Sequence, residues 1–351
     1  MAKKCLMIYD RKHTPLAEID DYCDDLKYGW TLNDVDTLNV SLALSSKKCT
    51  KVSTQFGNHI ELVDSSTGTA VWGGIICGQS FRDAKLELNC YDYNYLLKNR
   101  RLQPKTYGPI KYGALMQQMI ADCEAARPDY PTGIDGYNIA GGALQTTREV
   151  KNTDFLWAKI KEFGDDANYD YGVDTARTFN FWLRKGADKP QYILEWGGNR
   201  SNIIVCPTLA RDICSLENSV YAETDGDTKK MTSSAEDKLS QQAYGLFEGT
   251  FSPNSGVSIQ NTLDTQVNGE LQRDSQPASS IELTIMDSTR CPFSDIEVGD
   301  RVTVHLIPYF DFSASVRILR MVHDEKQNTR ELTVGNILFK PQLPTKRLYK
   351  G

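Results

Sequence analysis

Four histidines are the side chains best suited to acid–base catalysis or to metal binding: His13, His59, His305 and His323. The closest pair, His305 and His323, lies 18 residues apart, and no H-E-x-x-H motif is present. His59 and His305 fall within alternating stretches that predict strands, where a structural role is the usual one. The histidines therefore predict no metalloprotease-type site.

Nine cysteines could form disulfides or bind zinc. Their number is odd, no C-x-x-C pair occurs, and several lie inside apolar strand patterns. This usage favours buried free thiols in a reducing compartment over a disulfide framework. A zinc site would have to assemble from distant residues, because no pair has ligand spacing. The cysteines are Cys5, Cys23, Cys49, Cys77, Cys90, Cys123, Cys206, Cys214 and Cys291.

Neighbouring acids leave hydrolytic chemistry open. Asp20-Asp21 and Asp165-Asp166 could each contribute to a glycosidase pair of carboxylates. The run Asp225-Gly226-Asp227 resembles part of a calcium loop but lacks the spaced carboxylates and final glutamate, so a solvated turn is favoured. Nucleotide-binding and serine-hydrolase glycine motifs are absent. We therefore assign no catalytic, cofactor-binding or metal-binding residue and expect no cofactor.

Aromatic residues concentrate between positions 157 and 182. If these side chains were exposed, they could bind sugars or a protein partner. Phe179 and Phe181 lie at alternating positions, which fits aromatic side chains that fill the space between a helix and a sheet. We favour packing. The set comprises Trp157, Phe163, Tyr169, Tyr171, Phe179, Phe181 and Trp182.

Composition places the chain among soluble globular proteins, with 40% hydrophobic and 25% charged residues in 351. Lysine and arginine number 40 against 46 acids, a net charge of −6, which argues against tight DNA binding. A mildly acidic surface could still line a path along which DNA slides. The apolar run Cys5 to Tyr9 is too short for a signal peptide, and no stretch approaches a membrane span. We expect synthesis in the cytoplasm and no stable membrane binding.

The elements that would position any site are mainly strands. Residues 1–103 predict a first antiparallel β module, with strands at 5–9, 37–45, 59–63, 71–77 and 85–91 and a turn at Asp64 to Gly68. Residues 104–189 predict an α+β insertion domain, with one helix around Ala114 to Cys123 and a second capped by Thr153 or Asp154 and closed at Gly164. Strands are expected at 168–173, 179–183 and 192–196.

Residues 190–234 are interpreted as return strands, at 203–205 and 213–221, and a loop from Glu223 to Ser234, which together complete the first module. Residues 235–351 predict a second β module. Its helix should span Val257 to Arg273 and pack one stripe on a sheet, and its strands are expected at 281–285, 301–306, 315–322 and 330–334. The predicted fold class is α+β, mainly β, with two tube-like antiparallel barrel or sandwich modules and an α+β insertion.

The two modules show a common spacing. Leu38, which heads one alternating strand, lies 19 residues before Gly57, and Ile281 lies 18 residues before Gly299. A polar residue and a short strand follow each glycine, and two further strands follow in both modules. Glycine suits a tight turn at such a point. The match predicts an internal repeat, although two unrelated β meanders could also produce it.

Several segments resemble the tail hub, or tail-associated, proteins of bacteriophages, which are related to the hubs of contractile tails and of type VI secretion spikes. The resemblance covers nearly the whole chain and rests on patterns rather than on catalytic signatures. These segments are Trp72 to Ile76, Leu86 to Tyr93, Leu96 to Arg100, Asn202 to Ile204, Leu216 to Val220, Tyr244-Gly245 and Val298 to Val302.

The resemblance implies a structural virion protein of the tail tip or baseplate, not an enzyme. It implies a homotrimer whose six β modules form a pseudo-sixfold ring, which gates the passage of DNA. Implied partners are the distal tail protein, tail tube or tape measure proteins, and a tip fibre or spike, with DNA only in transit. The alternative from another class is a monomeric carbohydrate-binding or cell-wall-degrading tail protein, suggested by the aromatic residues and paired acids.

Overall fold

The computed structural model describes residues 4–336, apart from residues 21, 23–24, 143–144, 225–229, 254–256 and 258–259. Cys23, Asp21 and the Asp225 to Asp227 run lie outside the described residues. The described chain is mainly β, with its α-helices confined to two inserted regions, which confirms the predicted fold class. None of its described helices combines the length and apolar character needed to cross a membrane.

The first module contains the strands expected from alternating apolar residues. Its strands run in the order β3-β4-β7-β6-β5-β1-β2, and every neighbouring pair is antiparallel. Leu38, Val40 and Leu42 point from β4 into the core, because successive strand residues face opposite sides. The bounds are β1 (Lys4–Tyr9), β2 (Pro15–Ile19), β3 (Lys27–Thr31), β4 (Thr37–Ala43), β5 (His59–Asp64), β6 (Thr69–Arg82) and β7 (Lys85–Asp92).

The second module is built the same way around β18, β21, β20 and β19. These strands pair in that order, β14 lies beside β18, and β13 pairs in parallel with β19. The bounds are β13 (Asp188–Trp196), β14 (Thr208–Asp212), β18 (Ala278–Met286), η1 (Phe293–Asp295), β19 (Arg301–Leu306), β20 (Phe312–Asp324) and β21 (Thr329–Gly335). The expected strands at 281–285, 301–306, 315–322 and 330–334 are confirmed.

The prediction for residues 190–234 is wrong in its pairing. β13 and β14 add to the second module, not the first. Ile203 makes only an isolated bridge to Ile285, and the expected strand at 213–221 is reduced to β15 (Ser219–Glu223). Tertiary pairing, which local propensity does not encode, decides both points. The barrel interpretation is also wrong, because both modules lie in one open sheet of 13 strands.

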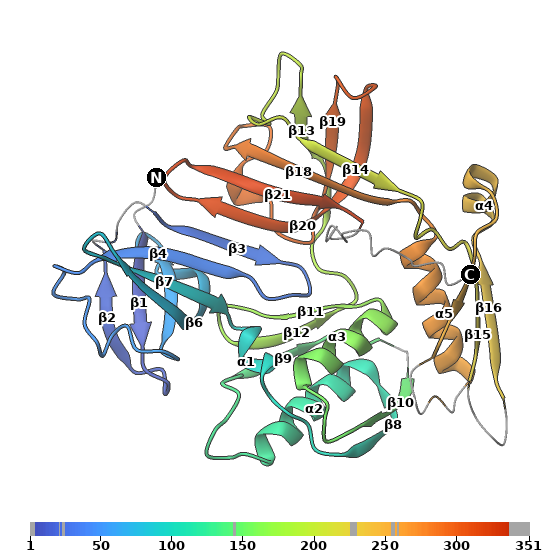
Figure 1. Ribbon diagram of the computed structural model, residues 1–351, viewed down its shortest axis with the longest axis horizontal. Coiled ribbons are helices and arrows are strands. Elements are labelled where there is room, and N and C mark those ends of the chain that lie inside the picture. The colour runs from blue at the N-terminus through green and yellow to red at the C-terminus, as the bar shows by residue number, and fades with distance from the viewer. Residues whose placement is uncertain are drawn as a thin grey trace, which may run out of the picture.

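The insertion domain follows β7 (Figure 1). It has its own hydrophobic core. The second of the two predicted helices, α3, begins after Phe155, and no described side chain caps it. It ends at Asn168, whose φ is 55°, and Gly164 lies within it because the ring of Tyr171 packs there. The predicted caps were therefore wrong. The elements are α1 (Tyr95–Lys98), β8 (Lys105–Lys111), α2 (Tyr112–Ala125), β9 (Gly136–Ile139), β10 (Gln145–Val150), α3 (Leu156–Ala167), β11 (Asp170–Val173) and β12 (Thr178–Trp182).

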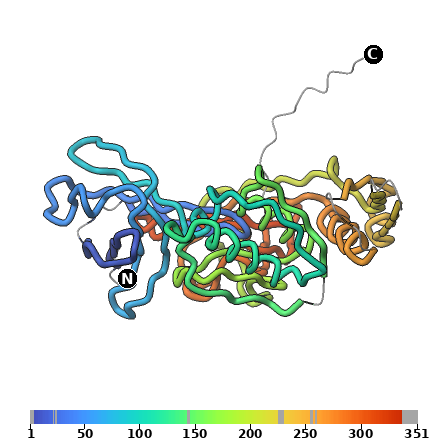
Figure 2. Tube along the Cα trace, turned by 90° about the horizontal axis from the view of Figure 1, so that it is seen from below, coloured from blue at the N-terminus to red at the C-terminus, as the bar shows by residue number. Residues whose placement is uncertain are grey.

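A second, smaller insertion separates β14 from β18. The strands β16, β15 and β17 form a sheet in that order, and α5 packs on it through Leu263, Val267 and Leu271. The predicted helix is confirmed, but it packs on this small sheet, and the expected boundary loop instead joins β15 to β16. The remaining bounds are β16 (Thr232–Glu236), α4 (Lys238–Tyr244), β17 (Glu248–Phe251) and α5 (Gln260–Asp274). Figure 2 shows this unit and the first module at opposite ends of the molecule.

Candidate assembly surface

The predicted internal repeat is present in the structure. β4-β7-β6-β5 in the first module corresponds to β18-β21-β20-β19 in the second, with the same order and the same antiparallel directions. The two glycines that suggested it both have positive φ, 80° at Gly57 and 102° at Gly299. One strand arrangement is thus used twice in one chain.

The repeat extends to individual hydrogen bonds. Gly57 N donates to Ile76 O at 2.8 Å, and Ile76 N donates to Asn58 O at 2.9 Å. Gly299 N donates to Ile318 O at 2.8 Å, and Ile318 N donates to Asp300 O at 2.8 Å. In both modules the long strand shifts register directly after this isoleucine. Ile76 and Ile318 are therefore equivalent positions.

A strand pair between β3 and β20 joins the two modules. Trp30 lies opposite Met321 and Tyr28 opposite His323, and Leu32 N donates to Leu319 O at 2.8 Å. Leu32, only 8% exposed, belongs to the core of the second module, and Trp30 packs against the cores of both modules. The junction therefore continues the main-chain hydrogen bonding and the apolar packing from one module into the next.

Charged groups fix this junction. Lys27 pairs with Asp324 at 2.8 Å, and Arg320 Nε lies 3.1 Å from Asp36 Oδ2. Glu325 pairs with Lys4 at 2.6 Å and with His323 at 3.1 Å. Burial alone would raise the pKa of Glu325, but hydrogen bonds from His323 and Lys4 lower it to about 2. The Glu325 carboxylate is therefore ionised in all but strongly acidic solution.

The joined sheet has one apolar and one polar face. On β18, the side chains of Ile281, Leu283 and Ile285 are buried. Glu282, which lies between the first two, and Met286, which follows Ile285, are exposed. On β7, Leu86, Leu88 and Cys90 are buried and Asn89 is exposed. Because the strands belong to one sheet, the polar residues of both modules lie on a continuous surface.

The histidines are not arranged as a metal site, although two of them meet. Pairing of β1 with β5 places the rings of His13 and His59 5.3 Å apart, beside Glu61 and Tyr93. Burial, helped by the charge of Arg177, lowers the pKa of His59 to about 4, so its ring is neutral at pH 7. Sequence spacing missed this contact. The register Tyr9 opposite His59 produces it.

The other two histidines lie apart, each beside an acid. His305 contacts Asp311 at 2.7 Å, and His323 contacts Glu325. No cluster of three or more histidine, cysteine, aspartate or glutamate side chains with metal-binding geometry occurs among residues that the structure describes. The residues here do not point to a metal centre.

The described members of the acid pairs, Asp20, Asp165 and Asp166, have structural partners. Asp166 Oδ2 accepts hydrogen bonds from Arg148 at 2.7 Å and from Gln266 at 3.0 Å, and Asp165 accepts one from the Tyr171 hydroxyl at 3.1 Å. Asp20 pairs with Lys48 at 2.6 Å. These contacts tie the two acids of the insertion domain to different neighbours rather than to a common substrate position.

The aromatic set suggested for sugar binding is mainly core. Trp157, Phe163, Tyr169, Tyr171, Phe179 and Phe181 are all buried in the insertion domain, and only Trp182 is partly exposed. The packing interpretation is confirmed for these residues. Seven of the described cysteines are free thiols: Cys5, Cys77, Cys90, Cys123, Cys206, Cys214 and Cys291. Cys206 and Cys214 are exposed, so the expectation of buried thiols is wrong for these two.

Sequence reasoning missed β3, the strand that makes the junction. Its signal is present, since Leu26, Tyr28, Trp30 and Leu32 alternate with polar residues or glycine at period two. The stretch is short and is followed by a turn, Asn33 to Asp36, so it resembles a loop in isolation. Its importance becomes visible only when β20 is placed beside it.

Comparison with solved structures identifies the same fold in tail proteins. The chain is similar to prophage tail protein gp18 from Listeria monocytogenes EGD-e, with 13% identity, a TM-score of 0.65, and 95% of this chain and 94% of that one covered. It is also similar to the 43 kDa tail protein of prophage MuSo2 from Shewanella oneidensis, with 10% identity, a TM-score of 0.66, and 94% and 98% covered.

A more distant match is a chain of the Francisella PdpA-VgrG complex, at 9% identity and a TM-score of 0.52, with 97% of this chain and 54% of that chain covered. No protein-family model and no curated protein matches the sequence. The similarity to phage tail and spike hub proteins, first indicated by sequence segments, is thus confirmed at the level of the fold.

Proposed function

We propose that this protein is a structural subunit of a phage tail tip or baseplate. Three copies form a ring in which six β modules lie around a central opening. The observation that carries the proposal is the doubled module: one chain presents two equivalent strand arrangements joined through one sheet. A trimer of such chains offers a sixfold tube six similar surfaces while keeping threefold symmetry for the structures below it.

In this ring the polar face of the joined sheet lines the opening. Asn39 and Asn89 of the first module and Glu282 of the second are exposed on that face, while the apolar face is buried against the cores. A net charge of −6 agrees with a path that DNA crosses without being held, because tight binding depends on clustered cations. DNA is thus a passing cargo.

The two insertions supply surfaces for other tail components. The insertion domain and the smaller insertion that contains α5 both project beyond the sheet that joins the modules (Figure 1). The ring would bind the distal tail protein or the tail tube on one side and a fibre or spike on the other, within the virion. Its role depends on geometry, and changes in the opening would gate the passage of DNA.

Electron microscopy of the purified protein tests the proposal. We expect annular particles with a central opening and six peripheral densities, related by threefold symmetry. Particles with the outline of a single chain at every concentration would contradict it. Release of soluble fragments from purified cell wall, above that of heat-denatured protein, would instead support the lytic alternative.

A further inference from the structure

Two of the strand edges that lack a neighbour belong to the run of strands shared by the two modules. Beyond Ile76, β6 leaves β5, and its last residues, Gly78 to Arg82, pair with β7 alone. β14 pairs with β18 alone and ends the sheet. These statements hold for the described part of the chain. Open strand edges are ready templates for pairing with another chain, and folded proteins usually protect them.

The internal repeat shows what should cover these edges. β6 is the equivalent of β20, because Ile76 matches Ile318. β14 is the equivalent of β3: Tyr28 lies opposite Leu38, Leu209 lies opposite Ile281, and Leu38 and Ile281 are equivalent. β3 and β20 pair with each other and join the two modules inside the chain. Their equivalents, β14 and β6, do not pair with each other within one chain.

We propose that β14 of one copy pairs antiparallel with the end of β6 in the next copy and so forms the contact between subunits. The inference rests on the proposed ring and specifies its interface. Transferring the register of the β3 and β20 pair places Phe81 opposite Leu209, Ser80 opposite Ala210 and Gly78 opposite Asp212. Ile213 N then donates to Cys77 O, as Leu32 N does to Leu319 O.

Side-chain exposure supports this pairing. Phe81 is 69% exposed, whereas its equivalent in the internal junction, His323, is 5% exposed and packs on Tyr28. Ile213 is 46% exposed, whereas its equivalent Leu32 is 8% exposed in the core of the neighbouring module. Both apolar side chains are therefore exposed at the positions that the internal junction buries. Pairing with a second copy would bury them in the same way.

The contact is head-to-tail, because β14 and β6 are different surfaces of the chain. Such contacts build rings when the rotation between neighbours closes. Here the contact between β14 and β6 copies the junction between β3 and β20 inside the chain. The rotation from each module to the next is therefore the same within a copy and between copies. Each copy then contributes one run of eight strands, β14-β18-β21-β20-β3-β4-β7-β6, to a sheet without ends.

Cysteine cross-linking tests the register. Ser80→Cys and Ala210→Cys are placed together in the full chain, since their equivalents, Val322 and Gly29, lie directly opposite each other in the internal junction. A directly opposed pair matches the Cα separation of about 4.4–6.8 Å that a disulfide requires. After mild oxidation we expect most of the protein to migrate as covalent trimer on a denaturing gel, with reduction restoring the monomer.

Two controls isolate this pair. The unsubstituted chain accounts for native cysteines such as Cys77, which lies within β6, and Cys214, which follows β14. The combination Ser80→Cys with Thr208→Cys is shifted by two residues on the same face, and we expect it to give less than a tenth of the covalent trimer. Equal cross-linking in both double variants would overturn the register.

A separate mass measurement keeps the two proposals apart. A trimer by light scattering without a covalent link between positions 80 and 210 would overturn this interface and leave the ring intact. Monomers that neither associate nor cross-link would contradict both the interface and the proposed function. Covalent trimers from the opposed pair alone support both.

Discussion

Asp92 is a buried carboxyl at the end of β7, where the first module meets the insertion domain. Its Oδ2 accepts hydrogen bonds from Asp36 N at 3.2 Å and Asn94 Nδ2 at 3.1 Å, while Oδ1 has no partner among the described residues. Burial, together with the charge of Asp36, raises the pKa of Asp92 to about 8. The side chain is therefore largely protonated at pH 7.

Replacing this group by a neutral amide should stabilise the fold. Between the unfolded pKa of 3.8 and the folded value of about 8, the folded state keeps a proton that the unfolded state releases, so the free energy of unfolding falls as pH rises. Asp92→Asn removes this dependence. We expect a gain on the order of 2 kcal/mol at pH 8 and a smaller one at pH 5 in urea unfolding. A loss at pH 8 would contradict this ionisation state.

Asp166 and Asp165 should differ sharply in their effect on stability. Asp166 neutralises Arg148, whose side chain is 1% exposed, so Asp166→Ala leaves a buried charge unpaired and should cost about 3–5 kcal/mol. Asp165→Asn, the adjacent control, keeps an acceptor for the Tyr171 hydroxyl and should cost about 1 kcal/mol or less. Urea unfolding monitored by tryptophan fluorescence measures both. Equal losses would show that the ion pair is not the main contribution.

At the scale of elements, the glycine turns that mark the repeat should respond unequally to alanine. A Cβ at Gly57 would meet the flexible side chain of Arg11, 3.0 Å from its Nε, whereas a Cβ at Gly299 would lie 2.7 Å from the main-chain oxygen of Lys185. Positive φ alone costs alanine about 1–2 kcal/mol. We expect Gly57→Ala to lower the free energy of unfolding by close to that amount and Gly299→Ala to lower it by clearly more. Thermal unfolding measures both losses. The reverse order would contradict the packing of the insertion domain against β19.

Local pattern predicts single elements well in this chain but predicts their pairing poorly. Alternation located β4, β5, β7 and β19, since apolar residues at every second position of each strand point into the core. The two short strands that make or offer junctions, β3 and β14, were both missed. Each has five residues, and its partner lies far away in sequence or in another copy. Such strands are stabilised by pairing, which no local signal encodes.

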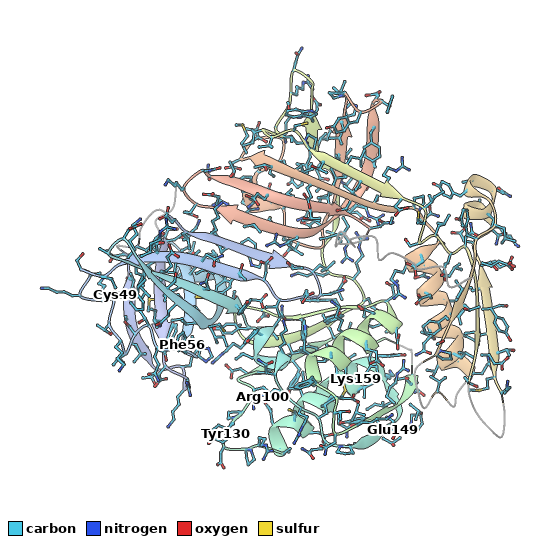
Figure 3. The ribbon with its side chains drawn as sticks, viewed as in Figure 1. Cys49, Phe56, Arg100, Tyr130, Glu149 and Lys159 are labelled. Carbon is cyan, nitrogen blue, oxygen red and sulfur yellow. The ribbon has the colours of Figure 1, made fainter. Side chains whose placement is uncertain are left out.

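At the scale of the whole molecule, the exposed apolar edge should control assembly without affecting folding. Phe81→Asp places a charge at the proposed subunit contact, and we expect it to shift the protein from trimer to monomer with an unchanged far-ultraviolet circular dichroism spectrum. Tyr130→Asp is the matched control: Tyr130 is 72% exposed and lies at the lower end of the insertion domain (Figure 3). Sedimentation velocity measures both variants. A trimeric Phe81→Asp protein would place the subunit contact elsewhere.

The candidate surface was only partly predictable from the sequence. Equal spacing from Leu38 to Gly57 and from Ile281 to Gly299 revealed the repeat, because both modules need the same strand and turn geometry. The junction was not predictable, since it depends on β3 meeting β20 almost 300 residues later. Exposure of Phe81 and Ile213 likewise becomes informative only beside the buried His323 and Leu32.

The native mass of the purified protein tests the ring most directly. Light scattering behind a sizing column, over a hundredfold range of concentration, should give a species near 118.5 kDa, three times the 39.5 kDa of one chain. A single species at 39.5 kDa across that range would contradict the ring.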